Sequence, residues 1–211
     1  MNNPVEASAL KGQVGRYPAE LVRDLETRDG KVVHLRPIQP EDDERLMEFH
    51  EHLSLRSVYR RFFFVHPKLS AVETEHFTHV DYVNRLALVI EHDGRVVGVG
   101  RYDRTAGTTD AEVAFVVADE FQHHGLGTIL LEHLAVAALE NGITAFVAET
   151  LAENRDMLGV FMNSGFHVTS SRDYGTVSLR FSIEPDDAYR SARALRRDSP
   201  HLDEESATQP C

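Results

Sequence analysis

The chain has 211 residues, of which 42% are hydrophobic and 27% charged, a composition typical of one soluble globular domain. Its formal net charge of −12 argues against general nucleic-acid binding, because phosphate contacts need Lys and Arg. No apolar run approaches the roughly 18 residues that span a bilayer, and the start MNNPVEASAL lacks the pattern of a secretory signal. We therefore expect a cytoplasmic protein that binds neither a membrane nor nucleic acid.

The only cysteine is Cys211, the last residue. An intrachain disulfide is impossible, and a cysteine nucleophile or a cysteine-based metal site within the core is not expected.

Three regions are expected along the chain. Residues 1–27 are predicted to form an arm with one or two helical turns over Tyr17–Glu26, and residues 28–184 the folded domain. After Pro185 the apolar content falls, so residues 185–211 are expected to be a disordered, polar and acidic tail.

The first half of the domain is predicted to contain one strand and three helices. These are a strand over Lys31–Arg36 after the turn Arg28-Asp29-Gly30, and helices over Pro40–Leu53, over Ser54–Phe64 and from Ser70 onward. Ser70 and Glu73 have the spacing of a capping box.

The second half is dominated by strands. The expected order is a hairpin of Arg85–Glu91 and Arg95–Tyr102, a strand over Ala111–Val117, a helix over Gly125–Asn141, a strand over Ala145–Thr150, a helix over Arg155–Ser164, and strands around His167–Ser171 and Val177–Phe181. Alternating strands and helices of this kind indicate an α/β fold.

The segment AEVAFVVADEFQHHGLGTILLEHLAVAAL carries the main functional signal: an apolar strand, a short loop and an amphipathic helix. Gly125 and Gly127 let the backbone approach a pyrophosphate closely, and the free N–H groups and dipole at the helix start favour its oxygens. Thr128 adds a hydroxyl in the first turn. We therefore predict an anion site that needs no cationic side chain.

The spacing of these glycines bears on three other interpretations. Two glycines at a helix start can simply relieve crowding. A Rossmann fingerprint would need a third glycine where Leu130 stands, and a P-loop would need Gly-Lys-Ser/Thr, which is absent. Neither nucleotide-binding fold fits.

Gln122-His123-His124-Gly125-Leu126-Gly127 resembles the acetyl-CoA signature Gln/Arg-x-x-Gly-x-Gly/Ala of the GNAT N-acetyltransferase superfamily. ENRDMLGVFMNSGF resembles its later motif Asn-x-x-(Ala/Met)-x-x-x-(Tyr/Phe)-x-x-x-Gly-Phe, and the resemblance covers about Lys31–Phe181. It implies the GNAT fold, a mixed twisted sheet of six to seven strands that splays near Val117 and is flanked by helices. Acetyl-CoA would lie in the splay.

The same resemblance implies which residues hold acetyl-CoA. The expected contacts are the signature residue Gln122, the N–H groups of His123, His124, Gly125, Leu126, Gly127 and Thr128 at the pyrophosphate, and Val116, Val117, Asn154 and Phe161 along the pantetheine arm.

SLRSVYRRFF and the strand that carries Glu112 are similar to the acetyltransferase domain of bacterial protein-lysine acetyltransferases of the Pat type, where a glutamate at this position serves as the base. A carboxylate on an apolar strand can take the proton of an attacking amine directly or through water. The alternative for Glu112 is a solvent-facing position, which antiparallel strands commonly provide.

Phe161 stands where many members of the superfamily have a tyrosine that protonates the leaving thiolate. Phenylalanine cannot donate a proton, but a thiolate with a pKa of about 8 to 9 is a tolerable leaving group. We therefore expect a mechanism with only the base and an oxyanion contact from a backbone N–H near Val116 or Val117.

Two further groups of residues were considered. The side chains of adjacent His123 and His124 diverge, and no carboxylate or cysteine has ligand spacing to them, so no metal site is expected. The arginines Arg56, Arg60 and Arg61 either touch the CoA 3′-phosphate or an acidic substrate, or form a solvated helix face, which is the interpretation we favour.

Together these patterns predict transfer of an acetyl group from acetyl-CoA to a primary amine, with a protein lysine as the expected acceptor and acyl-CoA synthetases as candidate acceptor proteins by the Pat resemblance. Two alternatives stay open. One is an N-acetyltransferase of small-molecule amines, and the other is a non-catalytic acetyl-CoA sensor, against which the intact Glu112 argues.

Overall fold

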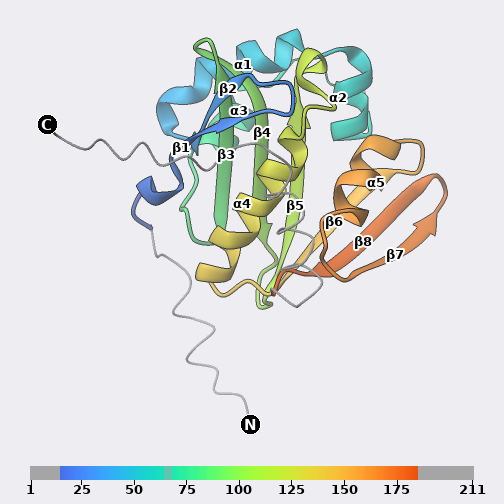
Figure 1. Cartoon of the computed structure of the whole chain (residues 1–211). Coiled ribbons are helices and arrows are strands. Elements are labelled where there is room, and N and C mark those ends of the chain that lie inside the picture. The colour runs from blue at the N-terminus through green and yellow to red at the C-terminus, as the bar shows by residue number, and fades with distance from the viewer. Residues whose placement is uncertain (1–14, 65, 67, 185–211) are drawn as a thin grey trace, which may run out of the picture.

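Eight strands of the described residues form one mixed sheet (Figure 1). The computed structural model describes residues 15–64, 66 and 68–184. The strands are β1 (Arg23–Glu26), β2 (Val32–Pro37), β3 (Arg85–His92), β4 (Arg95–Arg104), β5 (Asp110–Val117), β6 (Ala145–Leu151), β7 (Val168–Asp173) and β8 (Thr176–Ser182). Their order in the sheet is β1-β2-β3-β4-β5-β6-β8-β7, and only the pair β5 and β6 is parallel.

Helices connect these strands. They are the 3-10 helices η1 (Ala19–Leu21), η2 (Pro40–Asp42) and η3 (Asp119–Phe121), and the α-helices α1 (Asp43–His52), α2 (Leu55–Phe62), α3 (Ala71–Thr78), α4 (Leu126–Glu140) and α5 (Arg155–Met162). The predicted capping box of α3 is confirmed: the Glu73 N–H donates to Ser70 Oγ, and Glu73 Oε2 accepts from the Ser70 N–H at 2.8 Å.

The sequence predicted six to seven strands and the sheet has eight. The additional strand is β1, whose residues were expected to be helical. Residues 23–26 pair with 32–35 of β2, and only η1 is helical in the stretch Tyr17–Glu26. The four residues of β1 are exposed or half-buried, so no apolar alternation marks them as a strand. The boundary expected between residues 27 and 28 therefore falls inside the β1–β2 hairpin. Residues 1–14 of the predicted arm and the whole predicted tail, 185–211, lie outside the described residues.

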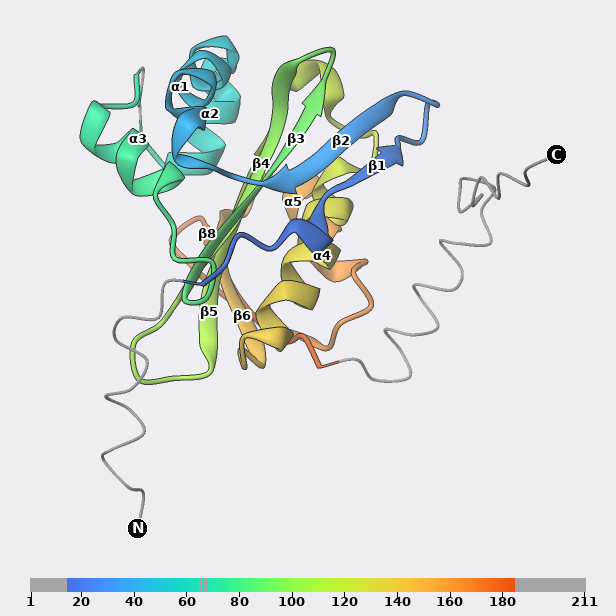
Figure 2. The ribbon, with the colours of Figure 1, turned by 90° about the vertical axis from the view of Figure 1, so that its left-hand side faces the viewer.

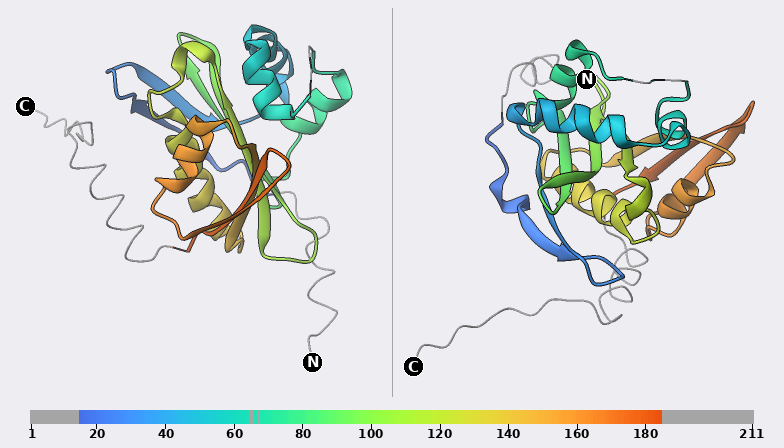
Figure 3. Two further views of the ribbon diagram at one scale, coloured as in Figure 1. Left: turned by 90° about the vertical axis from the view of Figure 1, so that its right-hand side faces the viewer. Right: turned by 90° about the horizontal axis from the view of Figure 1, so that it is seen from above.

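The helices cover the sheet in two layers. Figure 2 shows α1, α2 and α3 on one face of strands β3 to β5 and α4 on the opposite face. Helix α5 lies beside β6, β7 and β8, which turn away from the rest of the sheet (Figure 3). No helix in the described part of the chain is both long and apolar enough to cross a bilayer.

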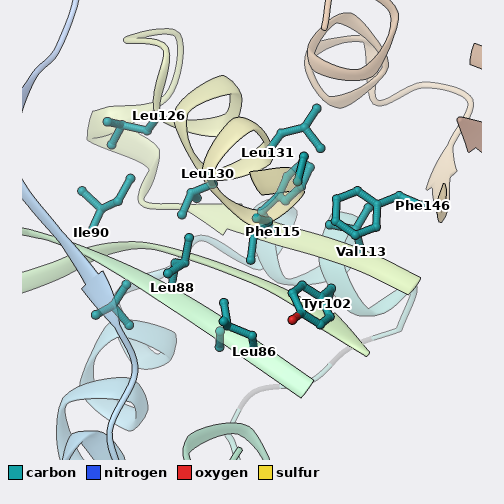
Figure 4. Packing of buried hydrophobic residues seen from close by; sticks show 14 of the residues in the cluster. Leu86, Leu88, Ile90, Tyr102, Val113, Phe115, Leu126, Leu130, Leu131 and Phe146 are labelled. Atoms are coloured by element: carbon teal, nitrogen blue, oxygen red, sulfur yellow. The ribbon is translucent and has the colours of Figure 1, made fainter. Parts of the chain in front are cut away.

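Helix α4 packs directly on β3 and β4. Its Leu126 and Leu130 lie over Leu88 and Ile90 of β3 (Figure 4), and all four are buried. The close approach to β4 depends on Gly100, since a Cβ there would lie 3.1 Å from Leu134 Cδ1 and 3.2 Å from Leu130 Cβ. This packing fixes where α4 begins relative to the end of β5.

A buried ionic network ties β2 and β3 to the start of α1. Arg36 of β2 donates to both carboxylate oxygens of Asp42, at 2.6 and 2.7 Å, and to Glu91 Oε1 of β3 at 2.7 Å. Burial raises the pKa of the Asp42 carboxyl, but the hydrogen bonds from Arg36 and the Gln39 N–H outweigh this and hold that pKa below its usual value. Burial also raises the pKa of Glu91, and hydrogen bonds from Arg45 and Arg36 outweigh it in the same way.

Arg36→Met should therefore destabilise the protein by about 3 kcal/mol, because two carboxylates that are largely buried lose the more buried of the two arginines that they share. Urea unfolding at pH 7 measures this. The matched control is Arg45→Met, which removes a more exposed guanidinium from the same two carboxylates and should cost about 1 kcal/mol or less. Equal losses of unfolding free energy in Arg36→Met and Arg45→Met would contradict the assignment of Arg36 as the centre of the network.

The effect of Arg36→Met should also depend on pH. The low pKa values of Asp42 and Glu91 stabilise the wild-type fold above their unfolded-state pKa values, and this stabilisation is lost as the pH falls through the lowered values. Protonation also neutralises the two carboxylates that in the variant have only Arg45 as a cationic partner. The difference in unfolding free energy between the wild type and Arg36→Met should therefore become smaller at acidic pH.

Candidate active site

The two central strands separate part of the way along their length. Strands β5 and β6 pair only at Asp110–Glu112 with Ala145–Val147 and then diverge (Figure 1). The splay thus begins directly after Glu112, five residues earlier than the position near Val117 that the sequence suggested. From Val113 onward no strand of the described residues pairs with β5 on its β6 side, so the backbone groups on that edge face a gap.

The loop between β5 and α4 presents backbone N–H groups to the same gap. His123 and Gly125 have left-handed backbone conformations, with φ of 67° and 91°, and Gly125 is the N-cap of α4. The N–H groups of residues 123–127 have no acceptor in the described part of the chain, whereas the Thr128 N–H donates to the Gly125 carbonyl at 3.0 Å. This arrangement of N–H groups at the positive end of a helix suits an anion.

Helix α2 is fastened over this loop by polar side chains. Gln122 Nε2 donates to the Val117 carbonyl at 3.1 Å and to Ser57 Oγ of α2 at 3.0 Å. Ser57 and Ser54, the N-cap of α2, both donate through their hydroxyls to Asp119 Oδ1. The signature residue Gln122 therefore braces the loop against β5 and α2 through its side chain.

The turn of the β1–β2 hairpin lies against the β5–α4 loop. The Arg28 N–H donates to the His124 carbonyl at 3.3 Å, and His124 Nδ1 lies 2.9 Å from Asp29 Oδ1. The Arg28 side chain passes Gly125 so closely that a Cβ there would lie 3.5 Å from Arg28 Nε. Arg28 is exposed and places a cation at the edge of the anion site, which the sequence did not indicate.

Two adjoining cavities occupy the splay. The smaller cavity, of about 270 Å³, is lined by the β5–α4 loop, and the larger cavity, of about 560 Å³, is lined by Glu112 among others. Five residues line both and so mark their junction: Arg60, Arg61, Phe115, Asn154 and Met157.

The smaller cavity gathers most of the residues that the sequence assigned to acetyl-CoA. They are Val116, Val117, Gln122, His123, Gly125, Leu126, Gly127, Thr128 and Asn154. Phe161 lines only the larger cavity, and His124, whose ring faces Asp29, lines neither.

Two arginines of α2 reach the junction. Arg60 donates from Nη1 to Asp156 Oδ2 of α5 at 3.1 Å, and its side chain is only 12% exposed. Burial lowers the pKa of Arg61, and the charge of Arg101 adds to this, while Glu112 and Asp103 oppose it. Of the three arginines expected to form a solvated face, only Arg56 is exposed, while Arg60 and Arg61 are half-buried. That interpretation is wrong for Arg60 and Arg61, which help to enclose the cleft.

Glu112 lies at the apex of the splay. It stands opposite Asp103 of β4 and Val147 of β6 in the last row where all three strands pair. Its side chain is exposed to the larger cavity, where Glu149 of β6 provides a second carboxylate. A carboxylate at this point can reach a group that enters the larger cavity.

The far wall of the larger cavity is built by α5 and β6. Asn154 is buried and caps α5, accepting from the Met157 N–H at 3.4 Å. Phe161 is 2% exposed, and its ring centroid lies 5.3 Å from that of Phe115 and 5.4 Å from that of Phe181. Phe161 is thus mainly a packing residue, with one edge at the cavity.

The described residues contain no group of three or more His, Cys, Asp or Glu side chains that could hold a metal ion. His123 Nδ1 lies 3.8 Å from Asp156, while His124 pairs with Asp29, so the two rings have different partners.

Comparisons with known proteins place this site in a family. The profile of the Acetyltransferase (GNAT) family matches residues 52–166. Acetyltransferase Pat of Mycolicibacterium smegmatis is 32% identical over 166 residues, which cover 77% of this chain and 49% of that protein. The crystal structure of the GNAT domain of S. lividans PAT is similar with a TM-score of 0.75 and 42% identity, over 79% of this chain and 99% of that one.

The chain therefore belongs to the GNAT acetyltransferase family, and it is Pat-like within it. It spans about half the length of the M. smegmatis Pat that it matches. The fold is also shared with yncA from Salmonella typhimurium, whose structure was solved with its cofactor acetyl-CoA, at a TM-score of 0.60 and 18% identity over 74% of this chain and 96% of that one.

Gly125→Val should abolish measurable acetyl-CoA binding, because a β-branched residue cannot easily adopt the φ of 91° that aims the N–H groups of the loop. Isothermal titration calorimetry measures the affinity. Gly142→Val is the matched control: Gly142 follows the same helix and has a φ of 74°, and a Cβ added there would meet no atom within 4 Å. This control should lose comparable stability and keep the affinity. Loss of binding in both variants would make general strain the cause.

Proposed function

We propose that the protein transfers the acetyl group of acetyl-CoA to the side-chain amine of a protein lysine, with Glu112 as the general base. The observation that carries this proposal is the position of Glu112. It stands at the apex of the splay, in a cavity that adjoins the one formed by the anion-binding loop.

The donor would bind along the smaller cavity. The N–H groups of residues 123–127 and the Thr128 hydroxyl would hold the pyrophosphate, and Arg28 would add a cation beside Gly125. The pantetheine arm would run along the unpaired edge of β5 at Val116 and Val117 and past Asn154. The arm's amides would then meet backbone groups that β6 leaves unpaired.

The reaction we propose is direct attack of the amine on the thioester carbonyl. The new C–N bond forms, Glu112 takes a proton from the amine directly or through water, and the C–S bond breaks with its electron pair on sulfur. The Ala118 N–H donates to Val97 of β4, so by strand alternation the Val116 N–H also points to β4 and the Val117 N–H points into the splay. Of the two oxyanion donors expected, Val117 is therefore the better placed.

A cationic acceptor suits the larger cavity. Glu112 and Glu149 bring two carboxylates to it. Of the three arginines on its walls, Arg60 and Arg180 are each paired with an aspartate, and burial lowers the pKa of Arg61. The net charge of −12 also attracts cationic partners over a distance. The resemblance to Pat proteins adds acyl-CoA synthetases as candidate acceptors.

Glu112→Gln should lower turnover by about 10²- to 10⁴-fold at neutral pH with little change in acetyl-CoA affinity, as expected for loss of a general base. The matched control Glu149→Gln removes a carboxylate from the same cavity. It should raise the KM for a lysine acceptor and leave kcat nearly unchanged. Thiol release at saturating acetyl-CoA and varied acceptor concentration measures kcat and KM of both variants. Equal kcat values in the wild type and Glu112→Gln would remove Glu112 from the mechanism.

The acceptor class can be tested with the purified protein, acetyl-CoA and a candidate acyl-CoA synthetase, in parallel with a panel of small amines. We expect one site-specific lysine acetyl mark in the mass spectrum, suppressed by Glu112→Gln. Acetylation of small amines alone, at rates that lysine peptides never approach, would instead assign a small-molecule acceptor. Binding of acetyl-CoA without transfer to any amine would assign a sensor.

A further inference from the structure

One hydroxyl group in the wall of the cleft is buried without a partner. Thr150 of β6 is 1% exposed and lines the larger cavity, yet its Oγ1 makes no hydrogen bond with any described residue. Arg60 Nε is a second buried atom of this kind in the cleft, but that guanidinium already pairs with Asp156 through Nη1. Thr150 is therefore a hydrogen-bonding side chain that the fold itself does not use.

Such a group destabilises the protein unless something else bonds to it. A buried hydroxyl that has lost water without gaining a partner costs free energy. Valine has nearly the same shape, favours strands equally well and would avoid this cost. A threonine at this position is thus explained if a bound ligand supplies the missing partner.

The direction of the side chain limits which part of the ligand this is. Along β6, Glu149 is exposed while Thr150 and Ala148 are buried, so Thr150 points to the side of the sheet where the buried Phe161 packs. Thr150 lies four residues before Asn154, and both line the larger cavity with Phe161. The junction with the smaller cavity is at Asn154, where the arm of a donor bound as proposed would bring its thioester.

We infer that the Thr150 hydroxyl donates a hydrogen bond to the sulfur of CoA as the C–S bond breaks. The inference rests on the function proposed above. Phe161 offers no donor to the sulfur, and Thr150 supplies one from the adjacent strand. The amine proton goes to Glu112, the electron pair of the C–S bond stays on sulfur, and Thr150 stabilises that thiolate without giving up its own proton. Solvent protonates the thiolate after release.

The test uses Thr150→Val, which keeps the shape and removes the hydroxyl, and Thr150→Ser, which keeps the hydroxyl. For Thr150→Val we expect kcat to fall about 10-fold with the KM of the acceptor unchanged. Its melting temperature without ligand should rise by about 2–4 °C, because the unpaired hydroxyl is gone. Thr150→Ser should recover most of the kcat. A wild-type kcat in Thr150→Val, a lower melting temperature, or no recovery with serine would overturn the inference.

A binding measurement separates this inference from the proposed function, because it needs no acceptor and no turnover. CoA and desulfo-CoA, which lacks the sulfur, are titrated into the wild type and Thr150→Val. The wild type should prefer CoA, and the variant should lose that preference while binding desulfo-CoA as the wild type does. If both affinities fall together, Thr150 supports the arm and not the sulfur, and the inference fails. If neither compound binds the wild type, the proposed function fails instead.

Discussion

The site depends on the early end of the pairing between β5 and β6. Beyond Glu112 and Val147 the two strands no longer bond to each other, so one edge of β5 is left without a strand partner in the middle of a sheet. Backbone polar groups in such a position need another partner, and an extended ligand with its own amides can provide it. The same divergence opens the two cavities and sets Glu112 at their apex. The position of this site is therefore determined by the geometry of the sheet, and the side chains act within the space that the sheet leaves open.

The gap is held at a defined width by contacts that cross it. Helix α2 is fixed to the β5–α4 loop through Ser57 and Gln122, and Arg60 of the same helix reaches Asp156 of α5 at 3.1 Å. On the other side, a Cβ on Gly127 would lie 3.1 Å from Val160 Cγ2, so α5 packs against the first turn of α4. The elements before and after the splay are therefore joined around the cleft as well as through the sheet. These contacts hold the β5–α4 loop and Glu112 in a fixed relative position.

The sequence predicted the fold family and the loop because their signals are local. The glycine spacing of Gln122–Gly127 determines backbone geometry within a few residues, and the structure places Gly125 at the start of α4 in a left-handed conformation that suits glycine. Arg28 escaped notice because its relation to Gly125 spans almost a hundred residues and depends on the hairpin of β1, itself too short and too exposed to be recognised. Arg60 and Arg61 lie among charged helix residues, and only the packing of α2 over the splay turns them inward.

The charges along the cleft differ between its two ends, and this difference suits a donor and an acceptor of opposite charge. Arg28 and the N–H groups of the loop favour a polyanion in the smaller cavity, while Glu112 and Glu149 place two carboxylates in the larger cavity, where Arg60 and Arg180 are paired with aspartates. In a chain whose net charge is −12, such a local cationic end reduces the electrostatic repulsion that a polyanionic donor meets as it approaches. A donor and an acceptor of opposite charge would then enter from different sides and meet at the junction lined by Phe115 and Asn154. The direct transfer proposed above, without a covalent enzyme intermediate, requires both reactants in the cleft at the same time, and two ends of opposite charge would favour that.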